Sequence, residues 1–263
     1  MTIPAPHRTA DEKLVGSDRV LAVLVELAQH HEGTTLDEIA QRIAGSKPTV
    51  HRALASLCRA GLAQQDGRGH YVLGDEFLRL AFAHHEARPD HVRVQPILEA
   101  LADRVGETTH YAVLDGDTIV YRAKVDPARG AMRLTSTIGG RNPAHTTAVG
   151  KLLLSYRLHT VDDVRTWIGA RVLEGRTASS ITSVDGLHDE LEVIRSRGYS
   201  VDDQENEPGV NCIALPFFRS SSSMPDGGIS ISAITQRTPL QELVDDLPAL
   251  RDVIGRPART DAA

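Results

Sequence analysis

The sequence predicts an α+β protein with a small helical module at the N-terminus, a connecting helix, and a larger C-terminal α/β domain on a mostly antiparallel sheet. Three observations predict this class. Residues 19–61 hold three short segments with apolar residues at helical spacing, and two short β-rich runs follow them. A helical pattern returns over residues 75–105. Residues 108–234 then intermix β-rich runs with amphipathic segments, which is typical of helices packed on an antiparallel sheet.

The composition is that of a globular protein. The 263 residues suffice for two domains, and the 41% of apolar and 24% of charged residues argue against a wholly disordered chain. No apolar run reaches the roughly 18 residues of a membrane span, and the first residues lack the apolar core of an export signal. We therefore expect a cytoplasmic protein that has no membrane partner.

The two cysteines, Cys58 and Cys212, lie far apart in the sequence. A disulfide framework is not expected from such a pair, and the number excludes a metal cluster built on cysteine.

Three short helices are predicted in the N-terminal module. Apolar residues at helical spacing place them at residues 19–31, 36–44 and 47–61. Pro48 suits the first turn of the third helix, where a missing N–H costs nothing, and Gly61 suits its end.

Two short strands are predicted after the third helix. The runs LAQQ and HYVL flank the turn DGRG at residues 66–69, as in a hairpin. Three short helices followed by a hairpin make a winged helix-turn-helix, which we place at residues 15–74. The order of the elements supports this prediction, because each element alone is common.

The third helix and the hairpin carry a basic charge. Between Arg42 and Arg68 there are five basic residues and one acid, a net charge of +4 in a chain whose formal charge is −6. Charge runs are often solvated surfaces, so a solvated helix in an interaction domain is the alternative. Because charge, element order and hairpin agree, we favour double-stranded operator DNA as the partner.

The candidate DNA-binding residues follow from what a recognition helix needs: an apolar face that seats it, polar or basic side chains for base edges, and cations for phosphates. They are Lys47, Thr49, His51, Arg52, Ser56, Arg59 and Arg68. Thr49 and Arg52 are the candidates for base edges, and Arg68 at the hairpin tip can enter the neighbouring minor groove.

A linker helix is predicted at residues 75–91, with a break near Pro89 before the helix resumes. Its apolar excess suits a helix packed on another chain.

The C-terminal domain is predicted at residues 92–254. It is expected to contain a hairpin at 108–125, helices at 147–157 and 184–198, and strands at 199–203, 212–218 and 228–234.

The loop GGRNPAHTTAVGK before the helix at 147–157 resembles a phosphate-binding loop only in its Gly-Lys. His145 stands at the position of the first required glycine, and Leu152 stands where a hydroxyl should reach Mg²⁺. We therefore predict neither a nucleotide nor any other cofactor. The helix start still favours an anion through its N–H groups and dipole, and Lys151 is assigned no role.

Several longer motifs carry a family resemblance. LDEIAQRIAGSKPTVHRALASLCRAGLA, YVLG, GGRNPAHTTAVGK, and GYSVDDQENEPGVNCIALPFF followed by SISA make the chain similar to IclR-type transcriptional regulators along nearly its whole length. The resemblance implies a winged helix-turn-helix, a linker helix, and a GAF-like effector domain that binds a small metabolite, commonly a carboxylate. It also implies homodimers or tetramers on palindromic operators. Pro48 replaces the usual serine or threonine, and Ala233-Ile234 replace the usual Gly-Pro.

The resemblance also implies an effector site, whose residues are Ala148, Val149, Gly150, Asp202, Val210, Cys212, Ser230 and Ser232. Ser230 and Ser232, two apart on a strand, point to the same face and can both donate to a ligand. Arg133 and Leu134 are weaker candidates for the wall of this site. Several residues of the effector site also have a purely structural interpretation. Cys212 can be a buried thiol, the serines can make local hydrogen bonds, and Asp202 can belong to a strand-end turn.

Three other functions compete with this prediction. A cysteine-dependent enzyme would use Cys212 as nucleophile and His110 or His145 as base, although nothing in the local sequence marks the thiol as activated. A metal site would use His145, Asp202 and Asp203, without any spacing typical of metal ligands. A sensor that does not bind DNA would leave the basic residues unexplained. We therefore predict a ligand-responsive regulator with no catalytic and no metal-binding residues.

Overall fold

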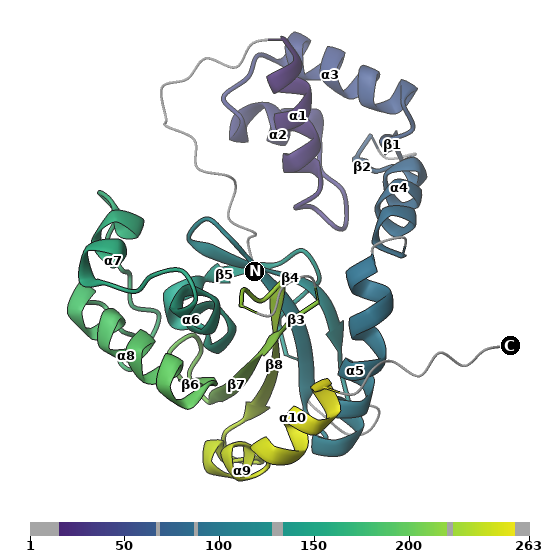
Figure 1. The fold of residues 1–263 in the computed structure, drawn as a ribbon. Helices are drawn as coiled ribbons and strands as arrows, with labels where there is room; N and C mark the ends of the chain where they lie inside the picture. Colours follow the sequence, from purple (N-terminus) through teal and green to yellow (C-terminus); the bar gives the residue numbers. More distant parts are fainter. Residues whose placement is uncertain (1–15, 67–68, 87–88, 128–133, 220–222, 256–263) are drawn as a thin grey trace, which may run out of the picture. The chain divides into compact units, whose positions relative to one another are not determined.

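The computed structural model describes residues 16–66, 69–86, 89–127, 134–219 and 223–255 (Figure 1). The chain divides into two compact units, residues 1–88 and 89–263. No helix among the described residues is long and apolar enough to cross a membrane.

The N-terminal unit has the predicted order of elements. Its helices are α1 (Gly16–Leu27), α2 (Leu36–Arg42), α3 (Lys47–Arg59) and α4 (Asp75–Glu86), and its strands are β1 (Ala63–Gln65) and β2 (Tyr71–Leu73). The strands pair in antiparallel fashion, so the winged helix-turn-helix is confirmed. The first helix differs from the prediction, since it starts at Gly16 and ends at Leu27.

One apolar cluster holds this unit together. It includes Val23 and Leu27 from α1, Ile39 from α2, and Val50 and Leu54 from α3, all at most 1% exposed. A capping box fixes the start of α2: the Thr35 hydroxyl accepts from the N–H of Glu38, and the Glu38 carboxylate accepts from the N–H of Thr35. The core therefore orients α3 so that its opposite face points outward.

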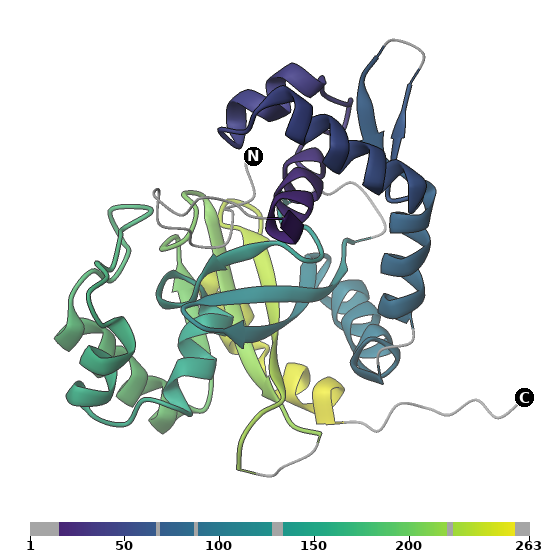
Figure 2. The same ribbon diagram turned by 90° about the horizontal axis from the view of Figure 1, so that it is seen from above.

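The C-terminal unit contains a six-stranded antiparallel sheet in the order β5-β4-β3-β8-β7-β6 (Figures 1 and 2). The strands are β3 (Thr108–Asp115), β4 (Thr118–Val125), β5 (Arg141–Pro143), β6 (Ser200–Asp203), β7 (Val210–Phe217) and β8 (Gly227–Ile234). The predicted hairpin and the three later strands are present. This mixed α+β architecture confirms the predicted fold class.

Helices cover both faces of the sheet. They are α5 (Pro89–Val105), α6 (Ala148–Ser155), α7 (Val161–Ile168), α8 (Val184–Arg197), α9 (Leu240–Asp245) and α10 (Leu247–Gly255). Helices α6, α7 and α8 lie on one face, and α5, α9 and α10 lie on the other, each set with its own apolar cluster (Figure 1). The sequence predicted α6 and α8, but not α7, α9 and α10.

Two consecutive glycines let both layers approach the sheet. A Cβ at Gly227 would lie 2.4 Å from the ring of Tyr111 on one face, and a Cβ at Gly228 would lie 2.5 Å from Val149 on the other. Because Val149 belongs to the first turn of α6, Gly228 lets the start of that helix lie directly on strand β8.

Candidate DNA-binding surface and effector site

Helix α3 has a buried face and an outward face. Val50, Ala53, Leu54 and Leu57 are buried in the core of the N-terminal unit. Of the predicted DNA-binding residues, Lys47, His51, Arg52 and Arg59 are exposed, and Thr49 and Ser56 are half-buried. The structure thus gathers six of these residues on one helix, and Arg68 lies outside the described residues.

Some of these side chains already have partners. Lys47 Nζ lies 2.7 Å from an Asp37 carboxylate oxygen, in an exposed ion pair. Arg59 donates to the Ser56 hydroxyl at 2.9 Å, and this hydroxyl donates to the carbonyl of Arg52 at 3.0 Å. Ser56 is therefore directed back at its own helix, where it positions Arg59.

His51 and Arg52 are the unengaged side chains of this surface. Within the part of the chain that the structure describes, neither side chain makes a hydrogen bond or an ion pair. They can contact nucleic acid without first breaking an intramolecular interaction.

The C-terminal unit presents two rows of polar side chains on one face of its sheet, because residues paired across antiparallel strands share a face. The first row contains Lys124, His110, Ser230 and Ser200, with the apolar Ala214 between the two serines, and the second contains Thr108, Ser232, Cys212 and Asp202. We call these nine residues the polar rows. Val210 follows on the same face, opposite Ile234. The structure thus brings all the strand residues of the predicted effector site together.

The start of α6 lies beside the polar rows. Val149 contacts strand β8 at Gly228, two residues before Ser230. The Thr147 hydroxyl caps the helix by accepting from the N–H of Gly150 at 3.1 Å, so that N–H is not free for an anion. In the described structure, the N–H groups of Ala148 and Val149 have no such partner. Of the first three N–H groups of α6, these two remain available to an anion.

Comparison with known proteins identifies both units. A family model described as the bacterial transcriptional regulator IclR C-terminal domain matches residues 91–256, and one described as the IclR helix-turn-helix domain matches residues 17–67. The chain belongs to the IclR family. It is therefore a transcriptional regulator with a DNA-binding helix-turn-helix and the effector domain of this family.

Individual IclR relatives cover most of the chain. The HTH-type transcriptional regulator KdgR of Escherichia coli (strain K12) is 34% identical over 221 residues, which are 83% of this chain and 82% of KdgR. The transcriptional repressor IclR of the same strain is 30% identical over 230 residues, 87% of this chain and 81% of its own length. The crystal structure of the IclR transcriptional regulator from Alicyclobacillus acidocaldarius shares the fold, with a TM-score of 0.78 at 24% identity over 91% of this chain and 95% of that chain.

Burial shifts the pKa of three side chains in the polar rows toward their neutral forms. Desolvation raises the pKa of Asp202 to about 7, although its carboxylate accepts from the backbone N–H of Glu205 at 2.7 Å. Burial also raises the pKa of the Cys212 thiol, and it lowers the pKa of His110 to about 3. Cys212 and His110 therefore present neutral hydrogen-bonding groups on this face, whereas Lys124 lies 3.1 Å from a carboxylate oxygen of Asp126.

His110 and Tyr121 also belong to this face, although neither was among the predicted effector residues. The ring centroids of the two side chains lie 4.7 Å apart, and the Tyr121 hydroxyl accepts from the Asn142 side chain at 3.3 Å. The alternation of Thr108, His110 and Ala112 in their strand was the available signal, since it places all three on one face. Leu134 contributes its carbonyl, which accepts from Lys124 Nζ at 3.1 Å, and Arg133 lies outside the described residues.

Lys151 has a structural role that the sequence did not indicate. Its side chain is 1% exposed and forms a buried ion pair with Glu205, with Glu190 of α8 at 3.8 Å. Assigning no role to Lys151 was therefore wrong. The lysine joins α6 to the turn after β6. The backbone of this turn also donates a hydrogen bond to the Asp202 carboxylate.

The geometry does not favour the cysteine-dependent enzyme. Cys212 donates to the Ser232 hydroxyl at 3.1 Å, and its raised pKa keeps it a thiol, whereas catalytic cysteines have a lowered pKa. His110 pairs with Ser136, and His145 pairs with the carbonyl of Glu174 at 3.0 Å. The relatives found are regulators and repressors, not enzymes.

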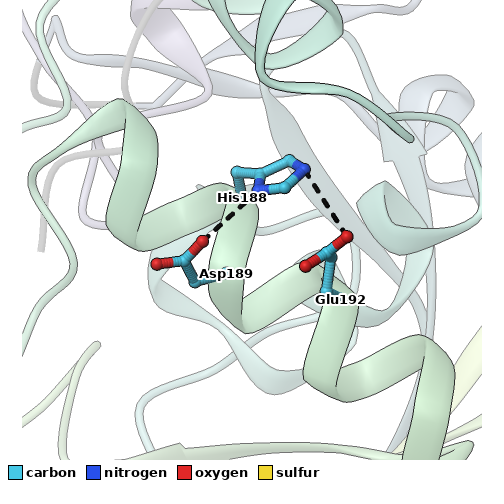
Figure 3. A group of neighbouring side chains, drawn as sticks. All are labelled: His188, Asp189 and Glu192. Atoms are coloured by element: carbon cyan, nitrogen blue, oxygen red, sulfur yellow. Dashed lines mark hydrogen bonds and ion pairs between the residues drawn. The ribbon is translucent and has the colours of Figure 1, made fainter.

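The residues of the alternative metal site are not those that the structure brings together. Among the described residues, the side chains close enough to share an ion are His188, Asp189 and Glu192 on α8, not the set of His145, Asp202 and Asp203 (Figure 3). Asp189 and Glu192 are 77% and 61% exposed and lie 3.4 and 3.9 Å from the imidazole nitrogens of His188. These distances describe ordinary ion pairs on a helix surface.

A small cavity of about 210 Å³ lies elsewhere on the C-terminal unit. It is lined by Val113, Leu114, Arg122, Leu153, Arg157, Met224, Pro225 and Asp226. The cavity shares no residue with the polar rows, so it does not extend the effector site.

Proposed function

We propose that this IclR-family chain binds a palindromic operator through α3, as a homodimer or tetramer, and responds to a small anionic metabolite, a carboxylate, at the polar rows. The observation that carries the proposal is the buried set of polar side chains beside the start of α6, in a different unit from the helix that meets DNA. Operator binding implies that the protein works in the cytoplasm.

Arg52 and Thr49 are the proposed base-reading residues. Both lie in the first half of α3, and recognition helices contact base edges with their N-terminal residues. Arg52 is unengaged, whereas the Thr49 hydroxyl lies 2.7 Å from that of Ser46 and would exchange this contact for a base. Lys47, His51 and Arg59 would contact phosphates, with Ser56 holding Arg59. Arg68 remains a proposal for the minor groove.

The carboxylate of the effector would bind at the first turn of α6. The N–H groups of Ala148 and Val149 and the positive end of the helix dipole favour an anion there. Ser230 and Ser232, 4% and 6% exposed, supply hydroxyl donors on the sheet below. Gly150 contributes close packing, because a Cβ at this position would lie 2.2 Å from the carbonyl oxygen of Ala144.

Helix α4 supports self-association. Leu78, Leu80 and Phe82 are 46%, 49% and 61% exposed on a helix of 12 residues. Exposed apolar side chains that gather on one helix are typical of an interaction surface, and we infer that a second copy of the chain packs on them.

Effector binding would regulate transcription by a population shift. A metabolite changes operator affinity only if it binds the two conformations of the protein with different affinities. Whether the regulator represses or activates then follows from which conformation binds DNA.

The test uses the full chain and two measurements. Selection from random double-stranded DNA should enrich inverted repeats, because a twofold oligomer reads two half-sites. Fluorescence anisotropy on the selected DNA, with and without each of a panel of small carboxylates, should show at least one acid that changes the affinity about fivefold or more. Absence of any selected sequence would remove the operator proposal, and constant affinity across the panel would remove the carboxylate proposal.

A further inference from the structure

One nitrogen of the His110 imidazole lacks a hydrogen-bond partner in the described structure. His110 lies in the first polar row, between Lys124 and Ser230, and is 1% exposed. Its Nε2 lies 2.8 Å from the Ser136 hydroxyl, whereas its buried Nδ1 has no partner. Because buried polar groups are normally hydrogen-bonded, a ligand group that reaches this atom gains an interaction that the protein alone does not make.

The imidazole is held in place on its other sides. Tyr121 packs against the ring, and the Ser136 contact fixes Nε2. The neighbouring cation is occupied, because Lys124 Nζ donates to the carbonyls of Leu134 and Ser136 and lies 3.1 Å from an Asp126 oxygen. The unpaired Nδ1 is therefore a fixed polar atom on the face of the sheet that carries the polar rows.

The chemistry of a neutral imidazole narrows the ligand group. Burial lowers the pKa of His110 to about 3, so the ring is uncharged at neutral pH. If Nε2 donates to Ser136, Nδ1 is an acceptor, and if Ser136 donates, Nδ1 carries the hydrogen. A hydroxyl group both donates and accepts, so it can pair with either tautomer, whereas a carboxylate can only accept.

We propose that the effector is a small carboxylate that also bears a hydroxyl group, and that His110 determines this specificity by hydrogen-bonding the hydroxyl through Nδ1. The inference rests on the proposed function of the polar rows as the effector site. Ser230, paired with His110 across the two strands, is an additional partner within the same row for the hydroxyl. The carboxylate would occupy the start of α6.

The experiment compares acids that differ only in the hydroxyl. Isothermal titration calorimetry on the full chain uses the pairs lactate and propionate, 3-hydroxybutyrate and butyrate, and 4-hydroxybenzoate and benzoate. In at least one pair the hydroxylated acid should bind about tenfold more tightly or better, because a site built to pair a hydroxyl discriminates against the analogue that lacks it. His110→Phe keeps the ring against Tyr121 and should abolish this preference.

Two further variants separate a ligand contact from a structural role. The amide of His110→Asn reaches the place of Nδ1 and should retain most of the preference, whereas the amide of His110→Gln reaches the place of Nε2 and should lose it. Melting temperature without ligand checks the fold of each variant, and if the Phe variant does not fold, the Asn and Gln variants decide.

Each contrary outcome has its own meaning. The role of His110 is overturned if the two acids of every pair bind equally, or if the preference survives in His110→Phe. It is also overturned if the preference is the same in the Asn and Gln variants. None of these results affects the carboxylate site. Failure of all six acids to bind the wild-type chain overturns the carboxylate site and this inference with it.

Discussion

The ammonium of Lys151 and the carboxylate of Glu205 form an ion pair inside the C-terminal unit, with the lysine 1% and the glutamate 10% exposed at their side chains. Lys151 comes from the first turns of α6, and Glu205 comes from the turn after β6. The N–H of Glu205 also donates to Asp202, so the ion pair and the second polar row share one turn. The helix that starts at the proposed carboxylate site is thereby tied to the strand that supplies Asp202.

Breaking this ion pair should destabilise the C-terminal unit. Lys151→Met leaves the buried Glu205 without its counter-ion, and losing one partner of a buried pair costs about 3–5 kcal/mol. Adding Glu205→Gln should recover a large part of that loss, because the uncompensated charge disappears. Urea unfolding followed by circular dichroism measures both. Lys47→Met, which removes an exposed ion pair, is the control and should stay within about 0.5 kcal/mol of wild type; equal effects of Lys47→Met and Lys151→Met would contradict the buried pair.

Asp202 should make stability depend on pH. The carboxyl ionises near 3.8 in the unfolded chain and near 7 when folded. Between these values the folded state binds more protons, so this contribution to stability is complete below about pH 4 and is lost as the pH rises through about 7. Asp202→Asn cannot ionise and keeps an acceptor for the N–H of Glu205. The melting temperature of the variant relative to wild type should therefore increase as the pH rises from 4 to 8. Melting curves across this range test it, with the exposed Asp203→Asn as the variant that should follow wild type.

Arg52→Ala should weaken operator binding. Loss of a base-reading arginine costs about 1–3 kcal/mol and relaxes the preference at one position of the site, whereas Arg59→Ala should lower affinity for all sequences and reduce the salt dependence by about one unit. Competition assays with single-base operator variants distinguish the two. Arg79→Ala on α4, an arginine that is 63% exposed and paired with Glu76, serves as the matched control. Wild-type affinity in Arg52→Ala would remove this residue from the interface.

The double change Ser230→Ala with Ser232→Ala should abolish ligand-induced thermal stabilisation by small carboxylates. Both hydroxyls are proposed to donate to the effector, and neither supports the DNA-binding unit, so operator affinity without ligand should persist. Ser155→Ala is the control, because Ser155 is equally buried but donates to the carbonyl of Leu152 in its own helix. A double variant whose melting temperature still rises with the acid would take the two serines out of the site.

Periodic patterns in the sequence predicted most of the fold. The buried residues of α3 and the alternation in β7 and β8 follow directly from helical and strand spacing, so the exposed face of α3 and the shared face of Ser230 and Ser232 could be predicted without a structure. Thr147 was also a readable capping signal, and it would have shown that the N–H of Gly150 is engaged. Helix α9, of six residues, is too short for a firm periodic pattern, whereas α7 and α10, of eight and nine residues, are no shorter than α6 and were missed by the prediction.

The interactions that the sequence could not predict are those between distant residues. Lys151 and Glu205 are 54 positions apart, and a Gly-Lys beside a loop gives no sign of a buried partner. His110 and Ser136 are 26 positions apart, so the unpaired nitrogen of His110 emerges only when the strand, the loop and Tyr121 are seen together. Local spacing predicts which face a side chain occupies, and the tertiary fold decides what it meets there.

The alternation of strands β3, β7 and β8 divides their residues between the two faces of the sheet. Even-numbered positions such as His110, Cys212 and Ser230 belong to the polar rows, whereas their odd-numbered neighbours Tyr111, Ile213 and Ile231 build the apolar cluster on the opposite face. If the polar rows bind the effector as proposed, a substitution at an even position would change which metabolite is recognised while the odd positions preserve the folded scaffold. Such a regulator would then acquire a new signal by point mutation, without first rebuilding its core.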